Sequence, residues 1–203
     1  MRNADKTDGS FLALLFRMKY ITRWSRMYVT QPESLSIHTV ECALLVHFLA
    51  NIGNVYFGCG HDPDGLSAYA LFHDATEIFT GDLPTPVKYF NDEIKEAYKK
   101  IEGTAAEALL SHLPGELANV YRGYFTGEKL DPAGLKLVKA ADRLCAYLKC
   151  VTETRSGNPE FISAYEKIER DMKEMDCREL DFFLKNCIDS FPLALDELSK
   201  ELT

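Results

Sequence analysis

The sequence predicts an all-α protein, and three observations carry that prediction. Apolar residues recur three or four positions apart through most of the 203 residues, which is the spacing of a helix with one buried face. Short stretches containing glycine or proline separate these segments. No segment alternates polar and apolar residues as a half-buried strand does. A helical bundle is therefore the expected architecture.

The helical pattern places five helices before the last break. They cover approximately residues 11–18, 36–52, 66–79, 94–109 and 132–153. Glycine and proline predict breaks at 58–65, 80–86, 114–115 and 157–159, and one or two further helices are expected after the last break. No repeat, low-complexity segment or long linker divides the chain, so we expect a single domain over residues 1–203 with a flexible tail at 1–9.

Composition excludes several classes of partner. The formal net charge is -8 and no run of lysine and arginine occurs, so we expect no nucleic-acid polymer as a partner. No stretch reaches the roughly 18 uninterrupted apolar residues of a membrane span, and the polar N-terminus lacks a secretory apolar segment. The six cysteines form no C-x-x-C pair, so reduced thiols are expected rather than a disulfide frame or a thiolate zinc site. These features predict a cytoplasmic protein.

Polar, metal-binding residue types lie on the inward faces of three predicted helices. His38 lies on the apolar face of the second helix, and Asp142 lies on that of the fifth. His73, Asp74 and Glu77 lie close together on the third, where Glu77 shares the face of His73. An ionised carboxylate in the interior needs a partner, and a metal ion is one. Two imidazoles and two carboxylates form a mixed nitrogen–oxygen site, which suits manganese, iron, cobalt, nickel or magnesium.

Each of these residues alone could instead be a buried, hydrogen-bonded polar group. A second His-Asp pair, His61–Asp62, shows how weak one dipeptide is. It lies in a Gly/Pro stretch, where Asp62 is expected to cap a helix that begins at Pro63. His47 and His112 have no adjacent carboxylate and are expected to be structural or exposed.

The order His38, His73–Asp74, Asp142 resembles the H…HD…D signature of the HD phosphohydrolase superfamily. Four longer stretches are similar to the bacterial HD-domain 5′-deoxynucleotidases of the YfbR type. They are ITRW at 21–24, HDATE at 73–77, TGDLPTPVKYF at 80–90 and KAADRLCAYLKC at 139–150. The resemblance extends over nearly the whole chain, including Phe191–Leu193, and the stretch at 80–90 is its most specific part.

The resemblance implies a single all-α HD domain that forms a homodimer and hydrolyses 2′-deoxyribonucleoside 5′-monophosphates. It implies one divalent cation per chain, cobalt, manganese or a similar transition metal, with the ligands His38, His73, Asp74 and Asp142. It implies catalytic roles for Glu77 and Arg23. It places substrate contacts at Arg23, Trp24, Asp74, Asp82, Leu83, Pro84, Thr85 and Asp142.

The chemistry of these residue types fits those roles. Glu77 can orient a water molecule and accept its proton. The planar guanidinium of Arg23 matches two phosphate oxygens. Trp24 would form a wall beside the sugar or phosphate, although a core or boundary aromatic is the simpler interpretation. Asp82 would meet the sugar 3′-hydroxyl, although a turn former after Gly81 is the simpler interpretation.

Two positions near these motifs have no assigned role. Lys88 adds positive potential close to the predicted substrate loop. Ile37 precedes the first metal histidine, where the family often has an acidic residue, so the residues behind that ligand should differ here.

Two other functions remain open from the sequence. The first is a different HD hydrolase, acting on a triphosphate, a cyclic dinucleotide or another monoester. The second is a nucleotide-binding regulator that has lost catalysis. The presence of Glu77 beside all four candidate ligands favours catalysis.

Overall fold

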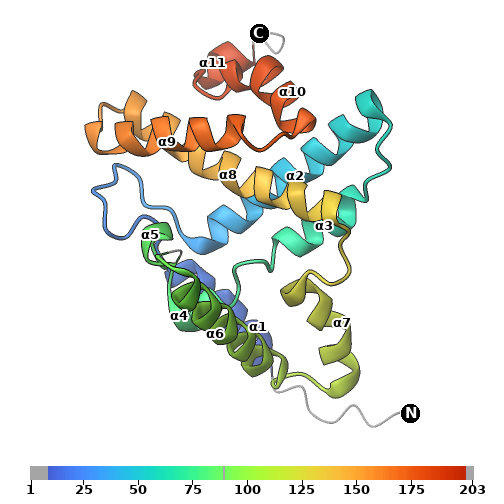
Figure 1. Ribbon diagram of the computed structural model, residues 1–203. Coiled ribbons are helices and arrows are strands. Elements are labelled where there is room, and N and C mark those ends of the chain that lie inside the picture. The colour runs from blue at the N-terminus through green and yellow to red at the C-terminus, as the bar shows by residue number, and fades with distance from the viewer. Residues whose placement is uncertain (1–8, 89, 200–203) are drawn as a thin grey trace.

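The computed structural model describes residues 9–88 and 90–199, and this part of the chain is built from helices (Figure 1). Two long helices cross at the centre, α2 (Leu35–Phe57) and α8 (Pro132–Arg155), and α3 (Pro63–Ala70) packs against α2. Helices α9 (Ile162–Lys173) and α10 (Arg178–Asn186) cover α8 and α2 on one side. Within the described ranges there is no strand, so the all-α prediction is confirmed.

The remaining elements are shorter or lie at the periphery. They are α1 (Ser10–Leu15), η1 (Phe16–Tyr20), α4 (Glu77–Thr80), α5 (Thr85–Lys88), α6 (Asp92–Leu110), α7 (Gly115–Thr126), η2 (Pro159–Phe161), η3 (Ile188–Ser190) and α11 (Leu195–Leu198). Residues 1–8 of the expected N-terminal tail lie outside the described residues.

Both central helices start and end at residues suited to those positions. The Ser34 side chain accepts a hydrogen bond from the Ile37 backbone and caps α2, and Asp131 caps α8 in the same way ahead of Pro132. Helix α2 ends at Gly58, whose φ of 64° is a left-handed conformation that glycine adopts at little cost. The second and fifth predicted helices are therefore confirmed, and both extend beyond their expected limits.

Two apolar clusters form the core. The larger lies between α2, α3, α8, α9 and α10, and its fully buried members include Val46, Leu49, Leu144 and Phe161. The smaller joins η1 to the start of α2 and to α6; its buried members are Phe11, Met18, Leu35, Ala75 and Leu109. By length and composition alone, helix α2 could cross a bilayer. However, 56% of its most apolar 18-residue stretch is buried inside the protein. It is the central helix of the core.

A buried carboxylate fastens the segment before α2 to α8. Glu153 is completely buried, and its oxygens accept hydrogen bonds from the Thr30 backbone at 2.9 Å and from Asn158 Nδ2 at 2.9 Å. Lys149 Nζ lies 2.6 Å from the same carboxylate. These bonds hold the pKa of Glu153 at about 2, because they outweigh the burial that would raise it. The loop that carries the candidate site residue Arg23 is therefore anchored at Thr30.

The third predicted helix is not continuous, and this corrects the prediction for 66–79. Regular helix ends at Ala70, tight turns cover 71–76, and α4 begins at Glu77. The Ala70 carbonyl accepts a hydrogen bond from His73 Nδ1 at 2.7 Å. In an unbroken helix that carbonyl would accept from the Asp74 backbone. The His-Asp pair therefore lies in a turn, where its side chains are not confined to helical directions.

The structure contains more helix after residue 84 than the sequence prediction gave. Helix α7 was not predicted, although Leu117, Val120, Tyr121 and Tyr124 follow helical spacing. The single turn of α5 was also missed, because 80–86 was treated only as a break. After residue 159 the structure has α9, α10 and the short α11, where one or two helices were expected.

Candidate active site

Four candidate ligands from separate parts of the chain meet at one point. His38 comes from α2, Asp142 from α8, and His73 and Asp74 from the turn between α3 and α4. His38 Nε2 lies 3.2 Å from Asp142 Oδ1 and 3.4 Å from Asp74 Oδ2, and His73 Nε2 lies 3.1 Å from Asp74 Oδ2. One ligand atom from each residue lies within 4.8 Å of all the others. This is the spacing of donor atoms around a single cation.

The hydrogen bonding of His73 suits it to bind a cation. A carbonyl oxygen only accepts, so the bond to Ala70 places the proton on His73 Nδ1. In the neutral ring the lone pair is then on Nε2, which points toward Asp74. His73 Nε2 and both ring nitrogens of His38 are buried without a hydrogen-bond partner. Buried polar atoms normally have a partner, and a cation at this point would supply one for both Nε2 atoms.

The charges of the site also favour a cation. Burial alone would lower the pKa of His38, but Asp142 and Asp74 raise it well above its ordinary value. Burial would likewise raise the pKa of Asp74, but His73 and His38 hold it well below its ordinary range. Both shifts show that positive charge is stabilised between the two carboxylates. The donor set therefore fits a divalent cation in both geometry and charge.

A short backbone pairing places Arg23 beside these residues. Thr22 and Ser34 form an antiparallel bridge, and the Arg23 backbone donates to the Glu33 carbonyl at 3.0 Å. The side chains then meet as well, with Arg23 Nε 2.9 Å from Glu33 Oε1 and Arg23 Nη1 3.6 Å from Asp74 Oδ2. The guanidinium is largely buried and directed at the candidate metal ligands.

Glu33 also belongs to the site, although the sequence did not predict it. Its carboxylate is buried, and Oε1 lies 3.8 Å from His38 Nδ1 in addition to its contact with Arg23. Glu33 therefore supplies the carboxylate next to His38 Nδ1, a charge that the apolar side chain of Ile37 cannot supply. Ile37 is half-exposed and lines a surface groove. Only the three-dimensional pairing of 22 with 34 reveals Glu33, because its spacing from the other residues follows no helical pattern.

Glu77 is the first residue of α4 and is buried, with its Oε2 atom lacking a hydrogen-bond partner. Burial, followed by the nearby charges of Asp74 and Asp82, raises the pKa of Glu77 to about 8. A carboxylate with a raised pKa and an unpaired oxygen can take up a proton near neutral pH.

A cavity of about 400 Å³ lies next to Arg23 and Asp142. Its lining includes Trp24, Asp82, Leu83 and Pro84, so most of the predicted substrate-contacting residues share one cavity. Thr85 begins α5, and its side chain lies outside the described part of the structure. The cavity therefore brings together predicted substrate contacts from three separate parts of the sequence, around residues 23, 83 and 142.

Trp24 both packs in the protein and lines this cavity. Its ring lies 5.2 Å from that of Phe161, centroid to centroid. Its backbone has a φ of 57°, which is uncommon for a large side chain and indicates local strain. Its indole nitrogen is buried without a partner. Trp24 thus both packs against Phe161 and lines the cavity, so the core and wall interpretations are compatible.

The structure also places the residues without an assigned role. Lys88 Nζ lies 2.7 Å from Glu102 Oε1 and over the Tyr98 ring, so it contacts α6. Asp62 caps α3 by accepting from the Gly65 backbone at 3.0 Å with Pro63 following, which confirms the capping prediction. All six cysteines are free thiols in the structure.

Comparisons with known proteins show which family the chain belongs to. A 5′-deoxynucleotidase of Shewanella oneidensis is 44% identical over 190 residues, covering 94% of this chain and 97% of the relative. The 5′-deoxynucleotidase of Vibrio cholerae is 42% identical over 192 residues, covering 95% and 99%.

Solved structures show the same fold. An HD-domain phosphohydrolase from Listeria innocua superposes with a TM-score of 0.79 at 22% identity, covering 91% of this chain and 89% of that one. The HD phosphohydrolase of cyanophage S-2L, bound to dA and one catalytic Zn²⁺ ion, superposes with a TM-score of 0.64 at 23% identity, covering 88% and 96%. Residues 10–191 match the family described as 5′-deoxynucleotidase YfbR-like. The chain belongs to this family.

Proposed function

We infer that the chain is a 5′-deoxynucleotidase, which hydrolyses 2′-deoxyribonucleoside 5′-monophosphates to deoxyribonucleosides and phosphate. The observation that carries this function is the convergence of four candidate ligands beside Arg23 and the unpaired carboxylate of Glu77. Relatives named 5′-deoxynucleotidase match over nearly the whole chain and support it.

One divalent cation would be held by His38, His73, Asp74 and Asp142. Cobalt or manganese is our choice, because imidazole and carboxylate ligands suit such transition metals. When bound, the cation would supply positive charge toward the phosphate oxygens and make water more acidic.

The remaining roles follow from the geometry of the side chains. Arg23 binds two phosphate oxygens through its planar fork, and Glu33 holds it in place from the other side. Glu77 accepts the proton of the attacking water, whose oxygen bonds to phosphorus as the bond to the 5′-oxygen breaks, and the departing 5′-oxygen takes a proton from solvent water to give the deoxyribonucleoside. Asp74 and Asp142 border the phosphate position, and Trp24 walls the cavity.

The sugar lies against the loop of Asp82, Leu83, Pro84 and Thr85. Asp82 accepts a hydrogen bond from the 3′-hydroxyl, and the prolines at 84 and 86 stiffen the loop. A 2′-hydroxyl would meet this loop without a partner, which costs about 1–3 kcal/mol, roughly 5- to 150-fold. We therefore expect dAMP to be favoured over AMP, with little preference among bases, and Asp82→Ala to narrow that difference. Equal kcat/KM for the two nucleotides would contradict this assignment.

Phosphate release across a nucleotide panel, with and without added divalent metals, tests the proposed function. Metal-dependent release from deoxynucleoside 5′-monophosphates is expected, with poor release from ribonucleotides and 3′-monophosphates. Preference for a triphosphate or a cyclic dinucleotide would instead identify another HD hydrolase. Tight nucleotide binding without release would identify a non-catalytic regulator.

A homodimer in the cytoplasm is the expected assembly. A groove of about 750 Å³ beside α2 is lined by apolar side chains that include Ile37, Leu44, Phe48 and Phe191. All four are at least 48% exposed, and such a patch favours contact with a second copy of the chain. Light scattering on the parent and on Leu44→Glu tests this: the parent should be a dimer and the variant a monomer.

A further inference from the structure

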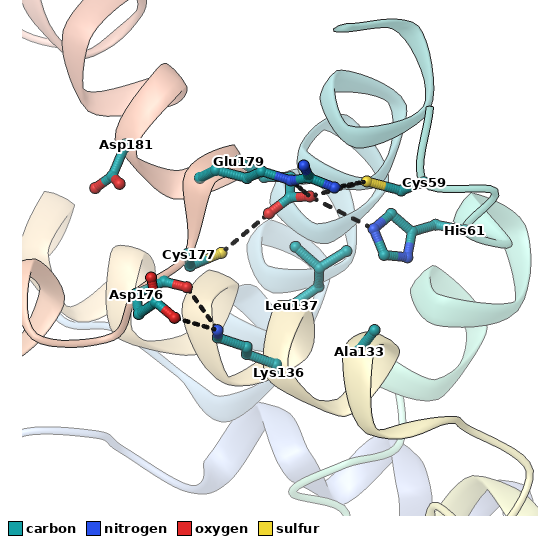
Figure 2. Close-up of a pocket in the computed structure, with 10 residues that line it drawn as sticks. Cys59, His61, Ala133, Lys136, Leu137, Asp176, Cys177, Glu179 and Asp181 are labelled. Carbon is teal, nitrogen blue, oxygen red and sulfur yellow. Dashed lines mark hydrogen bonds and ion pairs between the residues drawn. The ribbon is translucent and has the colours of Figure 1, made fainter. Parts of the chain in front are cut away.

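A second group of metal-binding side chains shares no residue with the candidate active site. Cys59 and His61 point from the loop between α2 and α3 toward Glu179 at the start of α10 (Figure 2). Cys59 Sγ lies 3.3 Å from Glu179 Oε1, and His61 Nε2 lies 3.6 Å from the same oxygen. The three ligand atoms all lie within 4.8 Å of one another.

The two separations that involve Glu179 Oε1 are close to the edges of a zinc coordination tetrahedron. With ordinary zinc bond lengths, the sulfur–oxygen edge is about 3.5 Å and the nitrogen–oxygen edge is about 3.3 Å. The observed distances of 3.3 Å and 3.6 Å agree with both values to within the variation of a side-chain rotamer. The arrangement is not that of a cysteine nucleophile, because Glu179 rather than His61 contacts the thiol.

His61 is fixed in an orientation that leaves one nitrogen unpaired. Its backbone donates to Asn54 Oδ1 at 2.7 Å and its carbonyl accepts from Asn54 Nδ2 at 3.0 Å. The side chain is only 9% exposed, and its Nε2 atom is buried without a hydrogen-bond partner. This nitrogen is directed toward Glu179, and a cation between the two side chains would give the nitrogen a partner.

The helix that faces this cluster has a glycine at the point of contact. A Cβ at Gly53 would lie 2.8 Å from His61 Cδ2, 3.0 Å from His61 Nε2 and 3.1 Å from Glu179 Oε1. Glycine in a helix interior is less stable than alanine. Gly53 therefore leaves the space in which the imidazole and the carboxylate approach each other.

Two further side chains border the cluster. Arg178 Nη2 lies 2.9 Å from Cys59 Sγ, and Arg178 Nε lies 3.5 Å from Glu179 Oε1. The Arg178 side chain is 60% exposed, so it can turn toward solvent when another cation takes its place. Cys177 Sγ lies 3.5 Å from Glu179 Oε2, on the other side of the carboxylate.

The geometry points to a second metal site, in which Cys59, His61 and Glu179 bind one Zn²⁺ ion and a water molecule takes the fourth position. A thiolate, an imidazole and a carboxylate are zinc ligands, whereas magnesium and calcium select oxygen. The adjoining cavity of about 470 Å³ gives the fourth position access to solvent. The ion joins the loop after α2 to α10, so its effect is on stability rather than on hydrolysis.

Cobalt substitution distinguishes this site from the active site. A Co²⁺ ion bound to a thiolate has an intense near-ultraviolet charge-transfer band, and the ligands of the active site include no sulfur. In an Asp142→Ala variant, which lacks a ligand of the first site, we expect one Co²⁺ per chain and a full band. Adding Cys59→Ser should abolish the band, and His61→Ala should weaken metal binding. Cys187→Ser, which alters a partly buried cysteine outside the cluster, should leave both unchanged.

Three measurements complete the test. Zn²⁺ should raise the melting temperature of Asp142→Ala and should not do so once Cys59→Ser is added. Arg178→Ala should tighten Co²⁺ binding, because it removes a competing cation, and the parent with Cys59→Ser alone should keep its phosphatase activity. A folded Asp142→Ala protein that binds no Co²⁺, or a charge-transfer band that survives Cys59→Ser, would overturn the proposal. These readouts do not require the proposed hydrolysis, so either proposal can fail without the other.

Discussion

Replacing Glu33 with glutamine tests whether this carboxylate positions Arg23 and His38. The substitution keeps the shape and a hydrogen-bond acceptor but removes the charge 2.9 Å from Arg23 Nε and 3.8 Å from His38 Nδ1. The contact is an ion pair between two largely buried side chains, and even an exposed ion pair contributes up to about 1 kcal/mol. A loss of about 1 kcal/mol in holding Arg23 corresponds to a rise in KM of about 5-fold.

The metal should respond through His38. Removing a partner behind a metal ligand typically costs about 10- to 100-fold in metal affinity, and the 3.8 Å separation places Glu33→Gln at the low end of that range. Metal titration and steady-state kinetics at saturating metal measure the two effects separately, and kcat should change less than KM. Glu41→Gln is the matched control. Glu41 lines the same surface groove as Glu33 but is exposed, and its substitution also removes one negative charge. A fall in KM would refute the positioning role, since it would mean that Glu33 competes with phosphate for Arg23.

Three further substitutions test the site and its support. Asp142→Ala should lose most activity and most of the metal of the active site while its circular dichroism stays helical; full occupancy of that site would contradict the ligand assignment. Glu77→Gln should keep the metal and lose about 10²- to 10⁴-fold in turnover. Because burial, Asp74 and Asp82 raise the pKa of Glu77 to about 8 and the base must be ionised, kcat/KM should rise with pH toward that value, and the bound cation should move the rise to lower pH. The depression of the Glu153 pKa from 4.5 to about 2 contributes about 3 kcal/mol of stability, which is fully present above pH about 4.5 and is lost as pH falls toward 2. Glu153→Gln should therefore have a lower free energy of unfolding at pH 7. Denaturant titrations at a series of pH values should also show that this free energy falls less between pH 4.5 and 2 than it does in the parent.

The sequence predicted best the parts of the site that lie on regular helices. His38 and Asp142 were placed inward by their spacing from apolar neighbours. His38 is completely buried, whereas the Asp142 side chain is 46% exposed, and the two side chains still meet at 3.2 Å. Helical geometry therefore gave the direction of each side chain but not the extent to which it is covered. The substrate loop was located by its prolines and by family resemblance, and it lines the same cavity as Arg23.

Helical periodicity gave a wrong prediction at the point where a side chain takes the carbonyl acceptor of a backbone hydrogen bond. Periodicity continued the third helix to residue 79, but the bond from His73 to the Ala70 carbonyl ends regular helix before the metal ligands. The spacing of apolar residues indicates which face of a helix is buried. It does not indicate where a side-chain donor takes the place of a backbone N–H. The consequence for function is a histidine whose proton is fixed on Nδ1 and whose Nε2 is free to bind a cation.

Contacts between distant segments account for the other omissions. Glu33 acts through its pairing with the segment at Arg23, and neither residue lies in a helix. Cys59 and Glu179 are 120 residues apart, and each has an ordinary local explanation, one in a loop and the other in the first turn of a helix. Their meeting depends on how α10 packs against α2, and Gly53 on α2 leaves the space for it. A glycine inside an otherwise regular helix was the local signal for that second site, because close approach is one reason for glycine there.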